Sequence, residues 1–246
     1  MLELLSPAGS PEAVVAAVQN GADAVYMGLG IFNARRGAKN FSDEEFEKAV
    51  RYCRIRGCKV YVTMNTLVGD REMEQAAELA RRVSDLGADA ILVQDIGLLS
   101  VLKRIVPDIP LHASTQMSIH DLAGVEAAAE MGLTRAVLAR ELSFEQIKFI
   151  TKHSPIETEI FVHGALCFCH SGQCYMSSLI GRRSGNRGMC AQPCRMEYTI
   201  GGRLEDSHPL SLKDNCLVDR LREIEDAGVA CVKIEGRMKR PEYTGI

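Results

Sequence analysis

The chain repeats one short theme, and this repetition is the feature that most constrains its fold. A helical stretch ends at a glycine, a short apolar run follows, and a polar or glycine-rich break closes the unit. The core GADA occurs at residues 21–24 and again at 87–90. Glycine at these junctions suits a left-handed helix C-cap that leads into a strand. The sequence therefore predicts a series of βα units.

The apolar runs predict eight strands, near residues 2–5, 24–27, 58–64, 90–94, 110–114, 135–139, 157–162 and 230–234. Seven helices separate them, and the last is expected over 213–227. Ser10 before Pro11 is a typical helix start, and two capping boxes are expected, Ser42 with Glu45 and Ser143 with Gln146. Because the strands are apolar throughout, both faces of the sheet should be covered by other elements.

Eight βα units favour a single (β/α)₈ TIM-like barrel over residues 1–246, with a doubly wound sheet as the alternative. We expect a cysteine-rich insertion at 163–205, between the seventh strand and the helix that follows it. The sequence ends soon after the eighth strand. We therefore expect a barrel without its last helix and without any C-terminal extension.

Composition limits the classes of function. The chain is 46% hydrophobic and 25% charged, it has no apolar run long enough to cross a membrane, and no basic stretch precedes the first apolar run, so we expect a cytoplasmic protein. The net charge of −3 gives no general attraction to nucleic acids, so RNA contact would need a local patch. Arginines around the insertion form either such a patch or an ordinary solvated loop, namely Arg182, Arg183, Arg187, Arg195 and Arg203.

Polar side chains follow most of the predicted strands, and in a barrel these positions form the active-site end. Such residues also meet solvent, so each one alone is weak evidence for a site. The candidates for substrate binding are Arg35, Asn65, Gln116, Arg140, Lys233, Glu235 and Arg237. Their cationic members would suit a carboxylate or phosphate ligand. The candidates for proton transfer are Asp95, Glu141 and His163, although a lone histidine is more often structural.

Four cysteines after the seventh strand have the spacing C-x6-C-x15-C-x3-C and are predicted to be metal ligands, namely Cys167, Cys174, Cys190 and Cys194. A disulfide framework is disfavoured by the expected reducing compartment and the odd total of nine cysteines. Structural zinc sites usually begin with a closer pair, whereas iron–sulfur clusters tolerate irregular spacing. Spacing therefore favours a cluster over zinc, and Cys169 is an alternative ligand.

The stretch from Glu159 to Ser177 spells the pattern E-x-F-x2-G-A-L-C-x4-G-x-C-x-M-S. This pattern resembles the signature of the collagenase-like peptidase family U-32, whose catalytic type is unknown. The opening ELLSPAGSPEAVVAAVQNGADAVYMGL, the segment NARRGAKNF and the closing VKIEGRMKRPEY are similar to the same family. The resemblance covers nearly the whole chain.

The family name implies proteolysis, but the resemblance extends to enzymes that hydroxylate RNA or a quinone precursor without molecular oxygen. Their targets are the wobble uridine of tRNA, a cytidine of large-subunit ribosomal RNA, or the ring of a ubiquinone precursor. In those groups four cysteines hold a four-iron four-sulfur cluster, and prephenate is implicated as the oxygen-atom source. The resemblance thus assigns the cluster to the four cysteines of the C-x6-C-x15-C-x3-C segment.

We therefore predict an iron–sulfur-dependent, oxygen-independent RNA hydroxylase, most specifically for the wobble uridine of tRNA and with prephenate as a co-substrate. The expected partners of the full-length protein are RNA and a small carboxylate, with no membrane. The alternatives are a collagenase-like peptidase, ubiquinone-precursor hydroxylation, and a non-catalytic barrel with a structural cluster.

Overall fold

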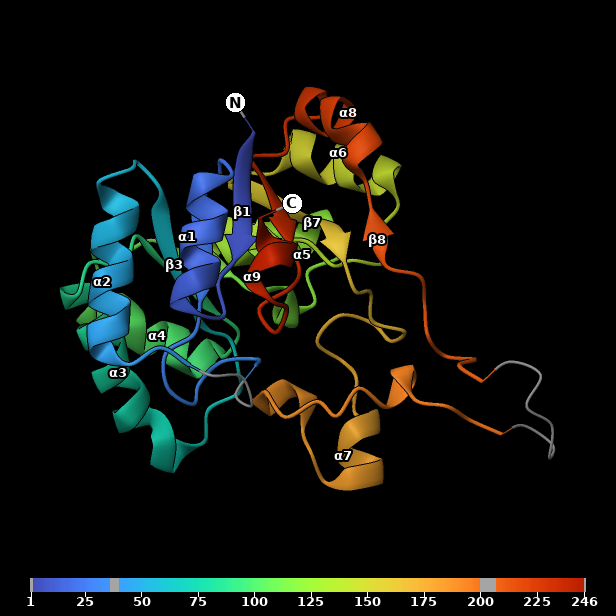
Figure 1. The fold of residues 1–246 in the computed structure, drawn as a ribbon, viewed down its shortest axis with the longest axis horizontal. Coiled ribbons are helices and arrows are strands. Elements are labelled where there is room, and N and C mark those ends of the chain that lie inside the picture. The colour runs from blue at the N-terminus through green and yellow to red at the C-terminus, as the bar shows by residue number, and fades with distance from the viewer. Residues whose placement is uncertain (1, 36–39, 200–206, 246) are drawn as a thin grey trace.

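The computed structural model describes residues 2–35, 40–199 and 207–245. Eight parallel strands close into a barrel, and a lobe that carries a short helix lies beside it (Figure 1). The barrel strands are β1 (Glu3–Pro7), β2 (Ala24–Met27), β3 (Lys59–Met64), β4 (Ala90–Val93), β5 (Leu111–Ala113), β6 (Arg135–Val137), β7 (Glu157–Gly164) and β9 (Cys231–Ile234). Neighbours pair in chain order, β7 pairs with β9, and β9 closes the ring on β1. The predicted TIM-like barrel is confirmed.

Helices cover the outside of the barrel between the strands. They are α1 (Pro11–Gln19), α2 (Asp43–Arg54), α3 (Met73–Asp85), α4 (Ile96–Ile105), α5 (Leu122–Glu130), α6 (Phe144–His153) and α8 (Leu221–Asp226). Ser10 caps α1, and the predicted capping boxes at Ser42 and Ser143 are present. Among the described residues, no helix combines the length and the apolar character that crossing a membrane requires.

The connection from β7 to β9 differs from its prediction. A helix was expected over 213–227, but α8 begins only at Leu221. Before it, β8 (Asn215–Cys216) pairs antiparallel with the end of β7. The Asn215 side chain donates to the Phe161 carbonyl at 3.0 Å, and the Leu217 amide donates to the Val162 carbonyl at 2.9 Å. These bonds to β7 replace the intrahelical bonds that the sequence pattern suggested.

The chain after β9 forms one short helix, α9 (Pro241–Thr244), which lies against α1 (Figure 1). Gly236, between β9 and α9, lies so close to the Tyr243 ring that an added Cβ would sit 2.5 Å from Cε1. The Tyr243 hydroxyl donates to the Glu235 carbonyl at 3.0 Å. This compact return fixes the residues that follow β9 over the carboxyl end of the barrel.

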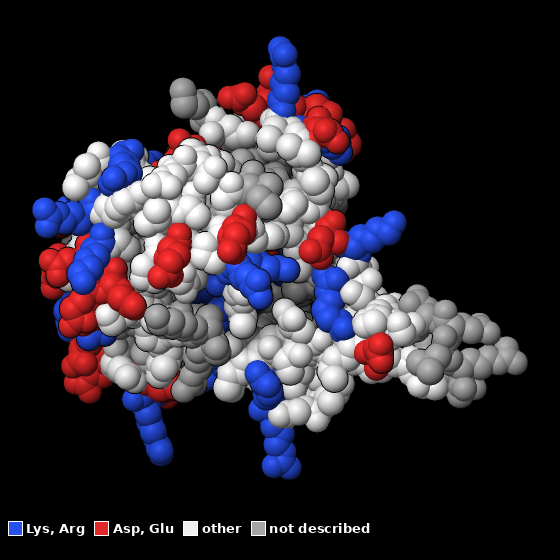
Figure 2. All heavy atoms as spheres, in the orientation of Figure 1, with Lys and Arg blue, Asp and Glu red and all other residues white. Residues whose placement is uncertain are grey.

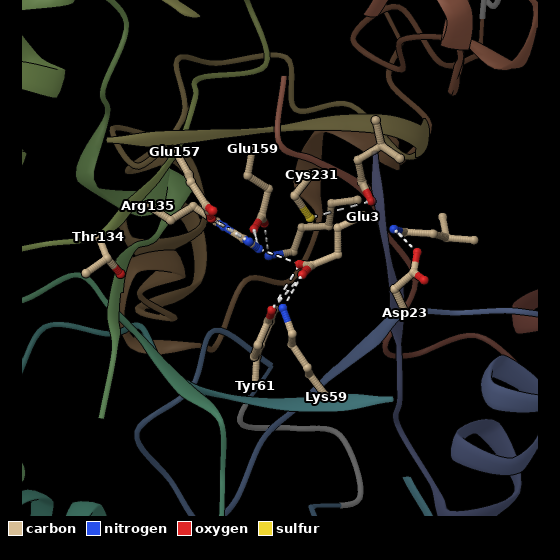
Figure 3. Close-up of polar contacts among 12 residues, drawn as sticks. Glu3, Asp23, Lys59, Tyr61, Thr134, Arg135, Glu157, Glu159 and Cys231 are labelled. Atoms are coloured by element: carbon tan, nitrogen blue, oxygen red, sulfur yellow. Dashed lines mark hydrogen bonds and ion pairs between the residues drawn. The ribbon is translucent and has the colours of Figure 1, made fainter. Parts of the chain in front are cut away.

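The amino end of the barrel interior holds an ion network centred on Arg135 (Figure 3). The Arg135 guanidinium lies 2.6 Å from a Glu3 oxygen, 2.7 Å from a Glu157 oxygen and 3.6 Å from a Glu159 oxygen. Glu159 is fully buried and also accepts from the Lys233 ammonium at 2.8 Å. The interior is therefore filled with paired charges at this end rather than with apolar side chains alone.

His112 is a buried histidine beside this network, and its Nδ1 has no hydrogen-bond partner among the described residues. Burial, followed by the charges of Arg135 and Lys233, lowers its pKa to about 3. The neutral ring is therefore the folded form, while an unfolded histidine takes up a proton near pH 6.5.

We expect the folded chain to lose stability as the pH falls below 6.5, because only the unfolded state gains a proton at His112. Between pH 7.5 and 5.0 this linkage amounts to about 2 kcal/mol of unfolding free energy. Urea titrations at the two pH values should show that loss, and His112→Gln should reduce it. His153→Gln, on an exposed histidine, is the control, and an equal loss in all three proteins contradicts the assignment.

Candidate active site

The carboxyl end of the barrel carries three arginines around one carboxylate. Arg35 and Glu235 form an ion pair at 2.7 Å. The charge of Glu235 raises the pKa of Arg35. Burial alone would raise the pKa of Glu235, but the charges of Arg35, Arg140 and Arg237 outweigh burial, and the pKa of Glu235 is lowered. Figure 2 shows Lys and Arg atoms gathered in a hollow between the barrel and the lobe. With three guanidinium groups against one carboxylate, this mouth is cationic.

Arg237 is the most deeply held of the three arginines. Its Nη1 donates to the Asn33 side chain at 3.2 Å and to the Thr63 hydroxyl at 3.0 Å. Burial, followed by the charge of Arg35, lowers its pKa to about 10, so the group still carries its charge at neutral pH. Thr63 was not among the predicted site residues. Asn33 follows the second predicted strand, as Arg35 does, and belongs with the strand-end candidates, but no role was assigned to it.

Asn65 organises the loop that carries Arg35. Its Oδ1 accepts from the Ala34 amide at 3.0 Å, and its Nδ2 donates to the Ser114 hydroxyl at 3.0 Å. Because both ends of the amide are bonded within the protein, Asn65 positions the mouth. The sequence placed Asn65 and Arg35 at neighbouring strand ends, and the structure brings them together.

Arg140 links the cationic mouth to the cysteine segment, defined here as residues 165–195. Its Nη2 donates to the Cys167 sulfur at 3.0 Å, and its guanidinium lies 5.3 Å from the centre of the Phe161 ring. Within the described residues, the Arg140 Nε is buried without a hydrogen-bond partner. Both Arg140 and Cys167 were predicted site residues, and here they are in direct contact.

The predicted ligand thiols influence one another electrostatically. Burial raises the pKa of Cys174, and negative charge on Cys169 and Cys167 raises it further. Burial also raises the pKa of Cys194, to which charge on Cys167 and Cys190 adds. All of these thiols are free. In the part of the chain that the structure describes, no three His, Cys, Asp or Glu side chains are placed to hold one metal ion.

Glu141 anchors the first half of the cysteine segment. Its carboxylate accepts from the Ser171 amide at 3.0 Å and from the Ser171 hydroxyl at 2.9 Å. Gly172, the residue after Ser171, has φ +75°, and a Cβ added to it would collide with the Gln116 carbonyl oxygen. Only glycine fits this close approach. Glu141, predicted for proton transfer, thus carries a positioning role in the structure, and Ser171 and Gly172 are positioning residues that the prediction missed.

A second attachment, made by Arg187, holds the other half of the cysteine segment. Arg187 forms a bidentate ion pair with Glu72, at 2.7 and 2.6 Å. The Leu67 amide donates to the Asn186 carbonyl at 3.1 Å. The lobe between the two attachments contains α7 (Met176–Gly181). These bonds fix the cysteine segment to the β3–α3 loop.

The predicted arginine patch is divided by the structure. Arg187 is used in the pair with Glu72, and Arg195 donates to the Leu166 carbonyl at 3.0 Å and to the Ser211 hydroxyl at 2.9 Å. Arg182 and Arg183 remain exposed beside α7. Arg203 lies outside the described residues. An RNA-binding patch here therefore stays a prediction that depends on fewer arginines.

The remaining predicted site residues make contacts elsewhere in the structure. Asp95 caps α4 through the Leu98 amide at 2.8 Å and also accepts from the Val68 amide at 3.1 Å.

Lys233 is buried in the barrel, bonded to Glu159, below the arginine mouth. His163 is exposed, and its ring centre lies 5.7 Å from that of Tyr243. Gln116 contributes its carbonyl to the contact with Gly172. Their predicted chemical roles stay predictions.

The sequence profile described as "Peptidase family U32" matches residues 9–245. The chain belongs to peptidase family U32. A 23S rRNA 5-hydroxycytidine C2501 synthase of Escherichia coli (strain K12) is 42% identical over 247 residues, which cover 98% of this chain and 37% of that protein. A tRNA hydroxylation protein P1 of Bacillus subtilis (strain 168) is 34% identical, with 98% of this chain and 60% of that protein covered.

Other U32 comparisons extend this picture. A collagenase of Porphyromonas gingivalis (strain ATCC BAA-308 / W83) is 34% identical, covering 98% of this chain and 62% of that protein. The U32 chain thus spans between 37% and 62% of the length of these three curated relatives. The solved structure of the U32 peptidase Mk0906 matches with a TM-score of 0.67 at 15% identity, covering 96% of this chain and 94% of that one, and it shows the shared fold.

Proposed function

We propose that this U32 barrel belongs to an RNA hydroxylase that works without molecular oxygen. In this proposal the cysteine segment holds an iron–sulfur cluster, and the arginine mouth binds a small carboxylate co-substrate. The relatives named for hydroxylation of ribosomal RNA and of tRNA support the reaction class. The protein's own geometry supports the arrangement of the two sites.

The observation that carries the proposal is the hydrogen bond from Arg140 to Cys167. It joins the cationic mouth to the thiol segment, so a carboxylate bound by the arginines would lie beside the sulfur ligands. Guanidinium groups bind carboxylates through paired, charge-assisted hydrogen bonds. The mouth carries three such groups, and Glu235 balances one of them.

The donor set fits an iron–sulfur cluster in kind. Cys167, Cys174, Cys190 and Cys194 offer four thiolates from separate stretches of one segment, the ligand type and number that such clusters take. Charge on Cys167 acts on both Cys174 and Cys194, and in the sequence the first cysteine pair is wider than the close pair with which a structural zinc site usually begins. When bound, the cluster would supply a site for the oxygen donor and a path for electrons.

The chain's own residues would perform the binding and orientation. Arg35 and Arg237 would hold the carboxylate, and Asn65 fixes the backbone next to Arg35. Arg140 would orient the co-substrate toward Cys167. Gly28 leaves room for this arrangement, because a Cβ there would sit 2.6 Å from the Arg237 Nη1.

The finer assignment, to the wobble uridine of tRNA with prephenate as oxygen donor, is part of the same proposal. Relatives named for tRNA hydroxylation support it, although the relative named for ribosomal RNA has the higher identity, 42% against 34%. The experiment must therefore measure both RNAs.

Deleting the gene should remove one hydroxylated nucleoside from the cell's RNA, measured by mass spectrometry of digested tRNA and of ribosomal RNA separately. Restoring the full-length gene should restore it, while the full-length gene with Arg237→Gln should restore at most about one hundredth, since the mouth loses a charge that no other group replaces. Arg240→Gln, on an exposed arginine beside it, is the control. Unchanged nucleosides in both RNAs would reject the proposal, and gelatin cleavage by the purified protein would then favour the peptidase alternative.

A further inference from the structure

A cavity of about 180 Å³ lies beside the arginine mouth, and the two share Arg140. Its walls come from β7, α6 and α8, through side chains that include Ile160, Ile147 and Ile224. Most of the other lining residues are apolar as well. The cavity therefore has mostly apolar walls, with polar groups from Arg140, Asn215 and Arg220.

The shortness of α8 explains why the cavity exists. In the other units a longer helix covers the barrel wall, but here α8 starts at Leu221 and the preceding residues follow β7 as β8. Leu217 and Asn215 therefore line the cavity where helical side chains would otherwise fill it. The space is therefore left open between β7, α6 and α8.

Arg140 is one of the residues that line the cavity. Its buried Nε–H has no acceptor among the described residues, and no carboxylate there forms an ion pair with its guanidinium. The charge of Arg140 does act on Glu235, whose pKa it helps to lower. A buried donor without an acceptor costs free energy, so an acceptor supplied by a ligand would stabilise the site.

A second arginine, Arg220, also lines the cavity and is already paired. Arg220 lies 2.8 Å from Glu223, and its guanidinium stacks 4.5 Å from the centre of the Phe144 ring. Because Glu223 balances Arg220, the positive charge available to a ligand in the cavity is that of Arg140.

We propose that this cavity binds a small monocarboxylate with an apolar body. The hydrocarbon part would lie among the isoleucines of β7, α6 and α8, and the carboxylate would accept from Arg140. An engineered apolar cavity of roughly 150 Å³ takes up benzene, so this volume suits a ligand of about that size. Because Arg140 also bonds Cys167, occupancy of the cavity alters the surroundings of that thiol.

Saturation-transfer NMR on the purified chain tests the proposal with three probes: benzoate, benzyl alcohol and acetate. Benzoate should bind at least about tenfold more tightly than benzyl alcohol, which lacks the charge, and than acetate, which lacks the apolar body. Equal binding of benzoate and acetate overturns the proposal, because the apolar walls then contribute nothing. Absence of benzoate binding overturns it too.

Filling the cavity locates the bound probe. Ile147→Trp and, from another wall, Leu217→Trp should each weaken benzoate binding at least tenfold, while Phe149→Trp on the exposed side of α6 should not. The chain contains no tryptophan, so the emission wavelength of each new indole shows whether it is buried in a folded protein. Undiminished benzoate binding in a folded, filled variant would place the probe at the arginine mouth and overturn the proposal.

Discussion

Replacing Cys174 with serine is expected to remove iron from anaerobically purified protein and to abolish RNA hydroxylation. A serine hydroxyl is a poor replacement for a thiolate ligand, and the other three thiols cannot complete the four that such clusters take. Iron and sulfide analysis together with the visible absorption of the anaerobic protein gives a direct readout. We expect iron content to fall at least fivefold relative to the unaltered chain.

Two further cysteine variants make this result specific. Cys216→Ser, on an exposed thiol of β8 that is outside the predicted ligand set, should leave iron content unchanged. Cys169→Ser tests the alternative ligand. Charge on Cys169 acts on Cys174 in the structure, so either thiol is a candidate for the same ligand position. If Cys169→Ser loses iron and Cys174→Ser keeps it, the ligand assignment is wrong. If the unaltered chain holds no iron, the cluster proposal itself fails.

Arg135→Met is expected to destabilise the barrel by about 3–5 kcal/mol. The substitution leaves Glu3 and Glu159 in the barrel without the guanidinium that lies 2.6 and 3.6 Å from their oxygens. Burial alone would raise the pKa of Glu3, but the hydrogen bond and charge of Arg135, followed by those of Lys59, lower it to about 2. Urea unfolding at pH 7 measures the loss.

The same network fixes the expected acid dependence. Since the folded pKa of Glu3 is below its unfolded value of 4.5, the stabilisation from Glu3 is present above pH 4.5 and disappears as the pH falls toward 2. Arg135→Met should therefore be less sensitive to pH in that window than the unaltered chain. Arg82→Met, which breaks an exposed pair with Asp43, should cost below about 1 kcal/mol. Similar losses for the two arginines would contradict the role of burial.

The strands and most helices could be predicted because their signals are local. Apolar runs of strand length, glycine at helix ends and serine caps depend on neighbouring residues only. The segment 213–227 failed for the opposite reason. Its first residues have a helical pattern, but Asn215 and Leu217 find stronger partners on β7, more than fifty residues away.

The candidate site was predicted as a set of strand ends, not as a set of contacts. The barrel rule placed Arg35 and Glu235 at one end, although 200 residues separate them in sequence. It could not show that Lys233 turns inward to Glu159, or that Glu141 binds the backbone of the cysteine segment. His112 and Arg135 lie in strands β5 and β6, where neighbouring apolar residues hide a buried neutral histidine and a buried ion-paired arginine from any pattern in the sequence.

The two attachments of the cysteine segment, Glu141 to Ser171 and Arg187 to Glu72, affect how the segment is expected to respond to loss of a metal centre. Both are made by protein side chains and backbone alone, and the lobe with α7 lies between them. A small zinc domain unfolds when it loses its metal. For the cluster proposed here, we therefore expect the segment to stay attached to the barrel in protein that has lost iron, so that added iron and sulfide restore the iron content of air-exposed protein.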